Sequence, residues 1–548
     1  MLSLFSSRKW AVHAALLVVA FLTLHLPAFA QANPDTQNAG KGRILLLLPF
    51  DNRTGQPNLE WVREAAPEIL SSRFISAGFA PLSRADRLFA LDHLGLPEGF
   101  QPSRASALKL AQTLDADSII VGSYTTDGTK LVAEAQIVDV AHLRMNPPVS
   151  AQGELRNLVA VFGSLAWKLT KDLDPGFSLA EDTFIAAGKG TRLDAFEQYI
   201  RGITEPDHDE RLRHLKQAVA LSPDFGAAWM ALGREDYAGQ QYDEAAAAFA
   251  KVGRNAPDAL EAGFYRGLSL LFSGDYPQAD EAFKSVAMVL PLAEVLNNQG
   301  VALSRQNRDG SAEFLAAESA DPNQADYHFN VAVNLKRRGQ SSAALAELAQ
   351  CLKLRPNDSE AQELQTEWAA PATSPAHTGG VDQDADTSAK TDPLERIIRT
   401  FDAGAFRQAA GMMDQVEAAR LAELAPHDRA VTFAAQAKGY LDRGLLLEAE
   451  RLYQSAVVAD ASVAEAHAGL AEVRERSGDS ASARKEAHAA LELKPSAEAY
   501  LVLGRLDLAD NHLDQAGQEA GAALKLDPAS RGAQDLSRQV AAKAAKSQ

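Results

Sequence analysis

The spacing of apolar residues divides the chain into a short part that contains strands and a longer helical part. "RILLLLPF" at 43–50 is a continuous apolar run ended by Pro and "DNRTG", which is typical of a buried strand. Residues 117–140 predict two strands around an Asp127-Gly128 hairpin turn. Helical spacing predicts helices over 58–77, 103–114 and 156–172, and "GFAPLS" at 78–83 fits a short strand. We therefore expect one small α/β domain at 43–175.

From about residue 193 onward the strand signals disappear and a 34-residue repeat begins. The pairs at this interval are Gly233 and Gly267, Ala245 and Ala279, Phe249 and Phe283, Pro257 and Pro291, Pro322 and Pro356, Gly444 and Gly478, and Ala449 and Ala483. A fixed period of this length predicts a solenoid of helix pairs. Small residues let two helices approach closely, the aromatic residue joins one pair to the next, and Pro ends the second helix. We interpret these positions as packing residues rather than a reactive pocket.

The repeat also has a recognisable consensus. Its pattern, W-x2-L-G followed by A, F and P, is carried in one unit by Trp229, Leu232, Gly233, Ala245, Phe249 and Pro257. This pattern resembles the tetratricopeptide repeat, and about eight or nine such units would cover 193–530. The unit at 393–425 is degenerate. The resemblance implies a general protein-interaction scaffold and does not indicate a partner.

Two segments without apolar periodicity separate these parts. Residues 176–192 contain "AAGKGT", which lacks the Gly five residues before the Gly-Lys pair that a phosphate loop needs, so we interpret them as a hinge. Residues 369–392 are rich in Pro, Gly, Ser, Thr and Asp and predict a flexible linker. The repeats then form two blocks, 193–368 and 393–548, the second ending in a polar capping helix. The expected fold is multidomain: a small α/β domain followed by an all-α tetratricopeptide-repeat solenoid in two blocks.

The α/β part carries a second resemblance. "LLPFDNRTG" and the later "ADSIIVGSYTTDGTKLVAEAQIVDV" are similar to the N-terminal α/β domain of TolB, as it occurs fused to tetratricopeptide repeats in bacterial proteins. The resemblance implies an envelope protein of a diderm bacterium and a docking role for residues 43–175. No β-propeller sequence follows, so the activity of TolB itself is not implied.

The N-terminus has the pattern of a targeting segment. Residues 1–30 have a positive start, an apolar stretch and a small-x-small site ending at Ala30, followed by a polar lead at 31–42. This pattern predicts a cleaved signal peptide and a periplasmic protein; the alternative is an uncleaved N-terminal anchor. No other stretch is long and apolar enough to cross a bilayer, so we expect no integral membrane span after cleavage.

Charge and cysteine content narrow the classes of partner and chemistry. The 548 residues carry a net charge of −18, which disfavours binding to a phosphate backbone, so no nucleic-acid partner is expected. Cys351 is the only cysteine, which excludes an intramolecular disulfide. It occupies a position where the repeat usually has Ala, and we expect a buried, inert thiol. The oligomeric state is left open.

The first helices of such repeats line a concave groove, and alignment on the Gly positions predicts its lining. The candidate peptide-binding residues are Met230, Arg234, Tyr237, Phe264, Leu268, Leu271, Phe329, Val333, Lys336 and Arg337. This apolar and basic mixture suits an extended or helical peptide with acidic ends. Asn298 and Asn330 lie two residues before Gly300 and its equivalent Ala332, where an Asn amide can bind peptide backbone. The alternative for every one of these residues is a purely local contact.

We find no sequence pattern for catalysis, a metal or a cofactor. His208 and His214 are six residues apart, which does not place them on one helical face, and no known zinc or nucleophile motif appears. The favoured function is a non-enzymatic periplasmic scaffold that binds a protein partner of the cell envelope in the concave groove. The alternative is a ligand or glycan sensor that acts through the α/β domain.

Overall fold

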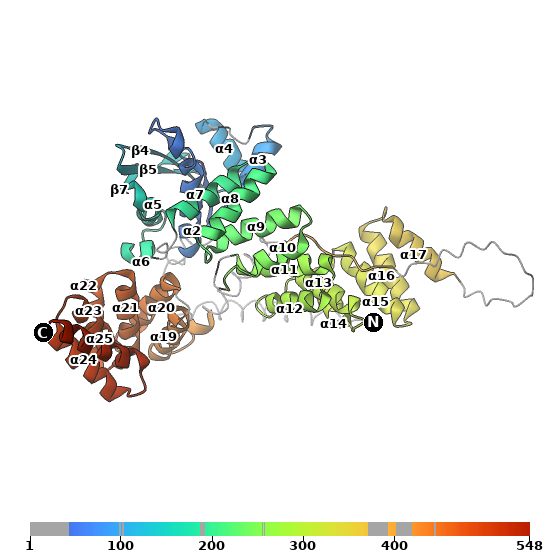
Figure 1. The fold of residues 1–548 in the computed structure, drawn as a ribbon. Helices are drawn as coiled ribbons and strands as arrows, with labels where there is room; N and C mark the ends of the chain where they lie inside the picture. The colour runs from blue at the N-terminus through green and yellow to red at the C-terminus, as the bar shows by residue number, and fades with distance from the viewer. Residues whose placement is uncertain are drawn as a thin grey trace, which may run out of the picture.

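The computed structural model describes residues 43–97, 100, 103–186, 192–254, 256, 258–370, 393–401, 419–442 and 445–547. The predicted signal peptide, the N-terminal lead and nearly all of the predicted linker lie outside these residues. Figure 1 shows the α/β domain, a first row of helices that runs away from it, and a second group of helices that lies near its α6. None of the helices in the described ranges combines the length and the apolar character that a membrane span requires.

One mixed sheet forms the centre of the α/β domain. Its strands are β1 (Ile44–Leu47), β2 (Asp51–Asn52), β3 (Ala80–Pro81), β4 (Ser118–Thr126), β5 (Lys130–Asp139), β6 (Arg144–Met145) and β7 (Val149–Glu154). The order is β3-β1-β4-β5-β6, with β2 beside β4 and β7 beside β5. Strand β1 is parallel to β3 and β4, whereas β4 and β5 form the expected antiparallel hairpin. Gly128 has a φ of 102° in its turn, a conformation that favours glycine.

Helices cover both faces of this sheet, which explains the uninterrupted apolar run of β1. Leu45 and Leu47 face the core shared with α2 (Val62–Ser76) and α5 (Leu158–Leu173). Leu46 and Leu48 face the opposite core, formed with α3 and α4. The sequence did not lead us to expect α3 (Arg84–His93) or the edge strands β6 and β7, whereas α4 (Arg104–Thr113) lies in the predicted range. The short β7 alternates buried and exposed residues only weakly, so its pattern is hard to detect.

The first repeat block is a row of antiparallel helix pairs. Its helices are α7 (Leu193–Thr204), α8 (His208–Leu221), α9 (Gly226–Ala238), α10 (Tyr242–Phe249), α11 (Ala259–Ser273), α12 (Tyr276–Ala287), α13 (Ala293–Arg305), α14 (Ser311–Ala320), α15 (Ala325–Arg337), α16 (Ser341–Leu354) and α17 (Ser359–Ala369). Consecutive helices pack on one another along the row. The predicted architecture, a small α/β domain followed by an all-α solenoid of helix pairs in two blocks, is confirmed.

The second block begins later than the sequence suggested. Within the described ranges its helices are α19 (Pro426–Asp442), α20 (Leu446–Ala459), α21 (Ala464–Ser477), α22 (Ser480–Leu493), α23 (Ala497–Ala509), α24 (Leu513–Leu526) and the closing helix α25 (Arg531–Ser547), and residues 419–422 before α19 are also helical. Residues 393–401, which we assigned to the start of this block, form neither helix nor strand. They lie against the first block, where they make polar and apolar contacts with α11, α13, α15 and α17. These contacts take the place of the packing between helices that a repeat of the second block would have.

An aromatic ring packed on a glycine is the recurrent contact within the helix pairs. A Cβ atom added to Gly267 would lie 2.6 Å from the ring of Phe283, and one added to Gly300 would lie 2.8 Å from the ring of Phe314. Gly233 meets Phe249 in the same way. Glycine recurs at this position of the repeat because the ring of the second helix occupies the volume that a side chain would need.

A side chain that hydrogen-bonds a backbone carbonyl six residues earlier recurs at the start of the first helices. Trp229 Nε1 donates to the Pro223 carbonyl at 2.7 Å. The equivalent pairs are His328 with Pro322, Gln362 with Pro356, His467 with Ala461, and Gln534 with Pro528. Trp229 is partly buried and packs against the core cluster, so it combines this bond with the gap filling that its position in the consensus suggests.

The two histidines at this position make the stability of the repeats depend on pH. The hydrogen bond that His467 donates to Glu486 raises the pKa of His467, against the opposing effect of burial. Burial lowers the pKa of His328, but bonds to Glu347 and the Pro322 carbonyl outweigh it, and the net direction is upward. Groups with a raised pKa contribute stability that is complete below the unfolded value of about 6.5 and is lost as the pH rises through the folded value.

We predict that the double variant His328→Gln with His467→Gln loses this contribution. Glutamine keeps the bond to the carbonyl, as Gln362 and Gln534 do, but carries no charge. The wild-type chain should have the higher Tm at pH 6, and its advantage should shrink as the pH rises to 8. Thermal unfolding of both chains over this pH range checks the prediction, and a difference in Tm that is constant with pH would contradict it.

The α/β domain and the solenoid share one continuous core. Phe196 of α7 packs edge-on against Trp61, with ring centroids 6.4 Å apart, and the cluster extends from the sheet to α9. Within the predicted hinge 176–192, residues Glu181–Ala186 form helix α6, which packs on α20 and α21. The buried Glu450 of α20 accepts from the Ala180 amide and pairs with Arg474 at 2.6 Å. The second block is thus docked on the α/β domain side of the molecule (Figure 1).

Candidate peptide-binding groove

The face of the first block formed by α11, α13, α15 and the start of α17, which we call the groove, holds a segment of the same chain. Residues Pro393–Phe401 contact four helices in turn, from α17 and α15 through α13 to α11. The segment therefore runs against the order of the repeats, and its few residues reach across several helices because they are extended. We call it the internal segment. Its contacts show which groups of the groove can bind a peptide.

Three buried asparagines bind the backbone of the internal segment. Asn330 accepts from the Arg396 amide at 2.7 Å and donates to the Arg396 carbonyl at 2.8 Å. Asn298 makes the same pair with residue Ile398, at 2.9 Å and 2.7 Å. Asn297 donates a further bond of 3.0 Å to the Arg396 carbonyl. All three side chains recognise main-chain atoms two residues apart, which is the repeat of an extended chain, so this part of the recognition does not depend on the side chains of the peptide.

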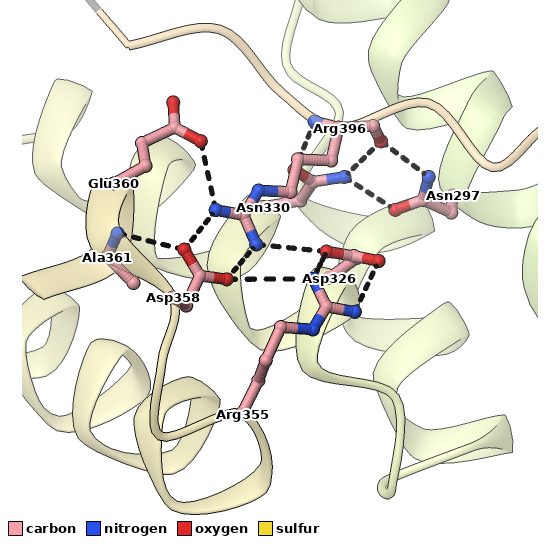
Figure 2. Close-up of polar contacts among 8 residues, drawn as sticks. All are labelled: Asn297, Asp326, Asn330, Arg355, Asp358, Glu360, Ala361 and Arg396. Carbon is pink, nitrogen blue, oxygen red and sulfur yellow. Dashed lines mark hydrogen bonds and ion pairs between the residues drawn. The ribbon is translucent and has the colours of Figure 1, made fainter.

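An acidic pocket beside the asparagines holds the Arg396 side chain (Figure 2). Its guanidinium forms ion pairs with Asp358 at 2.6 Å, with Asp326 at 2.9 Å and with Glu360 at 2.9 Å. The guanidinium carbon also lies 3.6 Å from the centroid of the Phe329 ring. A planar cation that stacks on an aromatic face and bonds several carboxylates at once is a recognition mode that arginine provides and lysine does not.

The electrostatics of this pocket follow from these pairs. The hydrogen bond from Arg396 lowers the pKa of Asp358, and burial opposes this effect. Burial would raise the pKa of Asp326, but bonds to Arg355 and Arg396 outweigh it and lower the pKa. Both carboxylates are therefore charged at neutral pH and remain so while Arg396 is bound. The charges of this pocket therefore favour binding of a cation.

A basic pocket binds the neighbouring residue of the internal segment. The Glu395 side chain is fully buried and pairs with Arg337 and, at 3.5 Å, with Arg305. Ser304 donates to the same carboxylate, and Arg337 also donates to the Pro393 carbonyl at 2.7 Å. Beside Glu395 the surface opens into a hollow of about 590 Å³. The arginines that line this hollow are Arg305, Arg308, Arg337 and Arg338.

The far end of the internal segment lies on an apolar and aromatic surface. Ile397 and Phe401 pack on the core cluster of α11 to α13, and the Phe401 ring lies 5.4 Å from the ring of Phe264. The guanidinium of Arg399 lies 5.0 Å from the centroid of the Phe272 ring. The groove thus offers a basic pocket, an acidic pocket, a backbone ladder and an apolar surface in sequence.

The structure places the twelve predicted groove residues in two groups. Those that contact the internal segment are Phe264, Asn298, Phe329, Asn330 and Arg337. Met230, Leu268, Leu271 and Val333 belong to buried core clusters, and Tyr237 packs on Tyr242, Tyr265 and Phe272. Arg234 pairs with Glu261 at 2.7 Å, and Lys336 lies 5.3 Å from the centroid of the Trp368 ring. The contacts named for these seven side chains are with other residues of the repeats, and their part in peptide binding stays a prediction.

Several residues of the groove were not singled out from the sequence. The acidic side chains of Asp326, Asp358 and Glu360 resemble the many other acidic residues of the repeats, and Asp358 also caps α17 by accepting from the Ala361 amide. Asn297 directly precedes Asn298, and this pair of amides was an available signal. We expected a peptide with acidic ends. The internal segment instead presents both an acidic residue, Glu395, and a basic residue, Arg396.

Cys351 and two clusters of metal-like donors are engaged in contacts within the repeats. Cys351 is buried in the cluster of α15 to α17, and burial raises the pKa of its thiol to about 11. Two clusters in the described ranges have metal-like donors: Glu318 with His328 and Glu347, and Asp507 with Asp510 and His512. The His328 ring already bonds Glu347 and the Pro322 carbonyl, while Asp507 and Asp510 both pair with Arg484. These contacts account for both clusters as structural features.

No protein-family model matches the sequence, and a search of curated proteins finds no match either. Solved structures with partial similarity include MamA from Desulfovibrio magneticus RS-1, at 21% identity over 31% of this chain and 100% of that chain, with a TM-score of 0.28. YrrB, described as a TPR protein with an unusual peptide-binding site, has 16% identity over 37% and 99%, with a TM-score of 0.28. The C-terminal domain of LpoB from Escherichia coli has 20% identity over 21% and 84%, with a TM-score of 0.19. Likenesses at this level carry no information on function.

Proposed function

We propose that this protein is a non-enzymatic scaffold of the bacterial periplasm that binds an extended peptide of an envelope protein in the groove of its first repeat block. The observation that carries the proposal is the ladder of Asn298 and Asn330, each of which pairs twice with the backbone of an extended chain. Buried amides are costly unless they are bonded, so their presence in a groove is accounted for by a peptide that satisfies them. The N-terminal targeting pattern supports the periplasmic part of the proposal.

The α/β domain is proposed to dock the scaffold at a second envelope component. The hollow between β1 and β4, lined in part by Leu48, Arg63 and Gly122, has a volume of about 90 Å³. Pockets that bind small ligands are typically ~300–1,000 Å³. This hollow is smaller than such pockets, which supports a docking role over a small-ligand site at this place in the domain.

The test is groove-dependent capture of a partner from the native envelope by cross-linking. The bait carries Arg396→Ala with Phe401→Ala, which weakens the internal segment without changing the groove. We expect it to capture a protein, and we expect Asn298→Ala with Asn330→Ala in the same bait to reduce capture at least ~10-fold, because four hydrogen bonds to backbone are lost. Asn323→Ala, at an exposed position, is the matched control and should leave capture unchanged. Capture that is insensitive to the asparagine ladder would refute the groove as the working site.

A further inference from the structure

We propose that the internal segment Pro393–Phe401 is an exchangeable ligand that closes the groove, and that the partner displaces it with an extended peptide of the same chemistry. That peptide carries a Glu-Arg pair followed, five residues after the arginine, by an aromatic residue, as Glu395, Arg396 and Phe401 do. The inference rests on the proposed function, because it names the ligand of the same groove.

The contacts of the internal segment are those of a ligand rather than those of a repeat. A repeat helix is held by apolar packing of its small and aromatic residues, as Gly267 and Phe283 show. The internal segment also packs Ile397 and Phe401 on an apolar surface, but it is held in addition through its backbone by buried amides and through two charged side chains by oppositely charged pockets. Each of these contacts can be reproduced by a free peptide, since none requires a covalent connection to the solenoid.

The connection of the segment to the chain sets the strength of the competition. It is joined to α17 and to the second block by the stretches 371–392 and 402–418. Tethering converts its binding into an intramolecular event, with an effective concentration that depends on the length of the connecting stretches. A partner peptide with the same contacts must therefore compete with this concentration, and its apparent affinity falls by the fraction of chains in which the groove is open.

The hollow beside Glu395 gives a partner contacts that the internal segment leaves unused. Its arginines Arg308 and Arg338 contact neither Glu395 nor Pro393, and they pair instead with Asp280 and Asp309 of their own block. Residue Leu394 of the segment is exposed and carries no charge for this hollow. A peptide with further acidic residues before its Glu-Arg pair would meet complementary charge there, so the favoured partner is acidic at this end.

The test measures binding of a fluorescent synthetic peptide, Thr391–Ala403, to the chain without its predicted signal peptide. Fluorescence anisotropy should show at least tenfold tighter binding to the chain with Arg396→Ala and Phe401→Ala than to the wild-type chain, because its internal competitor is weakened. A second variant, Ile398→Pro, removes the amide that donates to Asn298 and should act in the same direction if the first variant fails to fold. A probe peptide with alanine in place of its Arg396 should bind at least tenfold more weakly.

Two results would overturn the inference. Equal affinity of the probe for the wild-type and the double-variant chains would show that the segment does not compete for the groove. Failure of the probe to bind either variant would show that the segment is a fixed strut that joins the two blocks. Neither result would refute the proposed function, which fails only if partner capture is independent of Asn298 and Asn330. The ladder variants are compared within the double-variant chain, because in the wild-type chain they weaken the competitor and the ligand alike.

Discussion

Replacing Arg396 by glutamate should release the internal segment from the groove. The substitution places a fourth acid among Asp326, Asp358 and Glu360, and it removes the cation that stacks on Phe329. Truncating one partner of a buried, hydrogen-bonded charge pair costs about 2–5 kcal/mol, and like-charge repulsion adds to this loss. We expect the amide of Ile398, which donates to Asn298, to lose at least ~100-fold of its protection from hydrogen exchange.

Arg399→Ala is the matched control for this experiment. Arg399 belongs to the same segment and lies over Phe272 at 5.0 Å, but it is exposed, and a cation–π contact at such a site is worth only about 0.5–1 kcal/mol. Its removal should change the exchange of the Ile398 amide by less than ~10-fold. Unchanged exchange in the Arg396→Glu chain would mean that the acidic pocket does not hold the segment.

Phe283→Ala should be among the most destabilising single substitutions in the solenoid. Its ring is fully buried, packs edge-on against Phe264 and occupies the space above Gly267. Loss of a buried phenylalanine leaves a cavity and typically costs 3–5 kcal/mol, which chemical denaturation will measure. Phe89→Ala is the control, because that ring is 71% exposed and its loss should cost less than about 0.5 kcal/mol.

A second substitution tests the packing argument itself. Gly267→Ala alone should destabilise the chain by about 1–3 kcal/mol, because its Cβ atom would meet the Phe283 ring. In the Phe283→Ala chain the same methyl group enters the vacated space, so its cost should nearly disappear. Additive effects of the two substitutions would show that the glycine is required for another reason.

The period of the sequence was sufficient to predict the solenoid but not the occupant of its groove. The 34-residue interval reports local packing, such as Gly267 with Phe283, which repeats at short range. The bond between Asn298 and Ile398 joins residues 100 positions apart, and no periodicity records such a pairing. We therefore assigned Pro393–Phe401 to a degenerate repeat, although it lacks the small residues that repeat helices use.

Some residues of the candidate site could also be predicted from the repeat, and others could not. Asn298 and Asn330 could be found because they occupy a fixed position relative to Gly300 and Ala332, which the repeat alignment defines. The acidic pocket could not be found from the sequence. Asp326, Asp358 and Glu360 come from two helices, and they acquire a common role only when Arg396 lies between them. In the α/β domain, the continuous apolar run predicted a buried strand. It could not show which helices cover Leu45 on one face of the sheet and Leu46 on the other.

The docking of the second block on α6 has a thermodynamic consequence for the groove. It anchors the far end of the chain that carries the internal segment, through Glu450 and its contacts with Ala180 and Arg474. If the second block leaves α6, that end becomes free, the volume accessible to the segment grows, and the probability of its return to the groove falls. Linkage requires the reverse as well: a peptide that fills the groove and expels the segment weakens the docking by the same factor. The docking contact at Glu450 and the occupancy of the groove are therefore linked, because the same chain joins them.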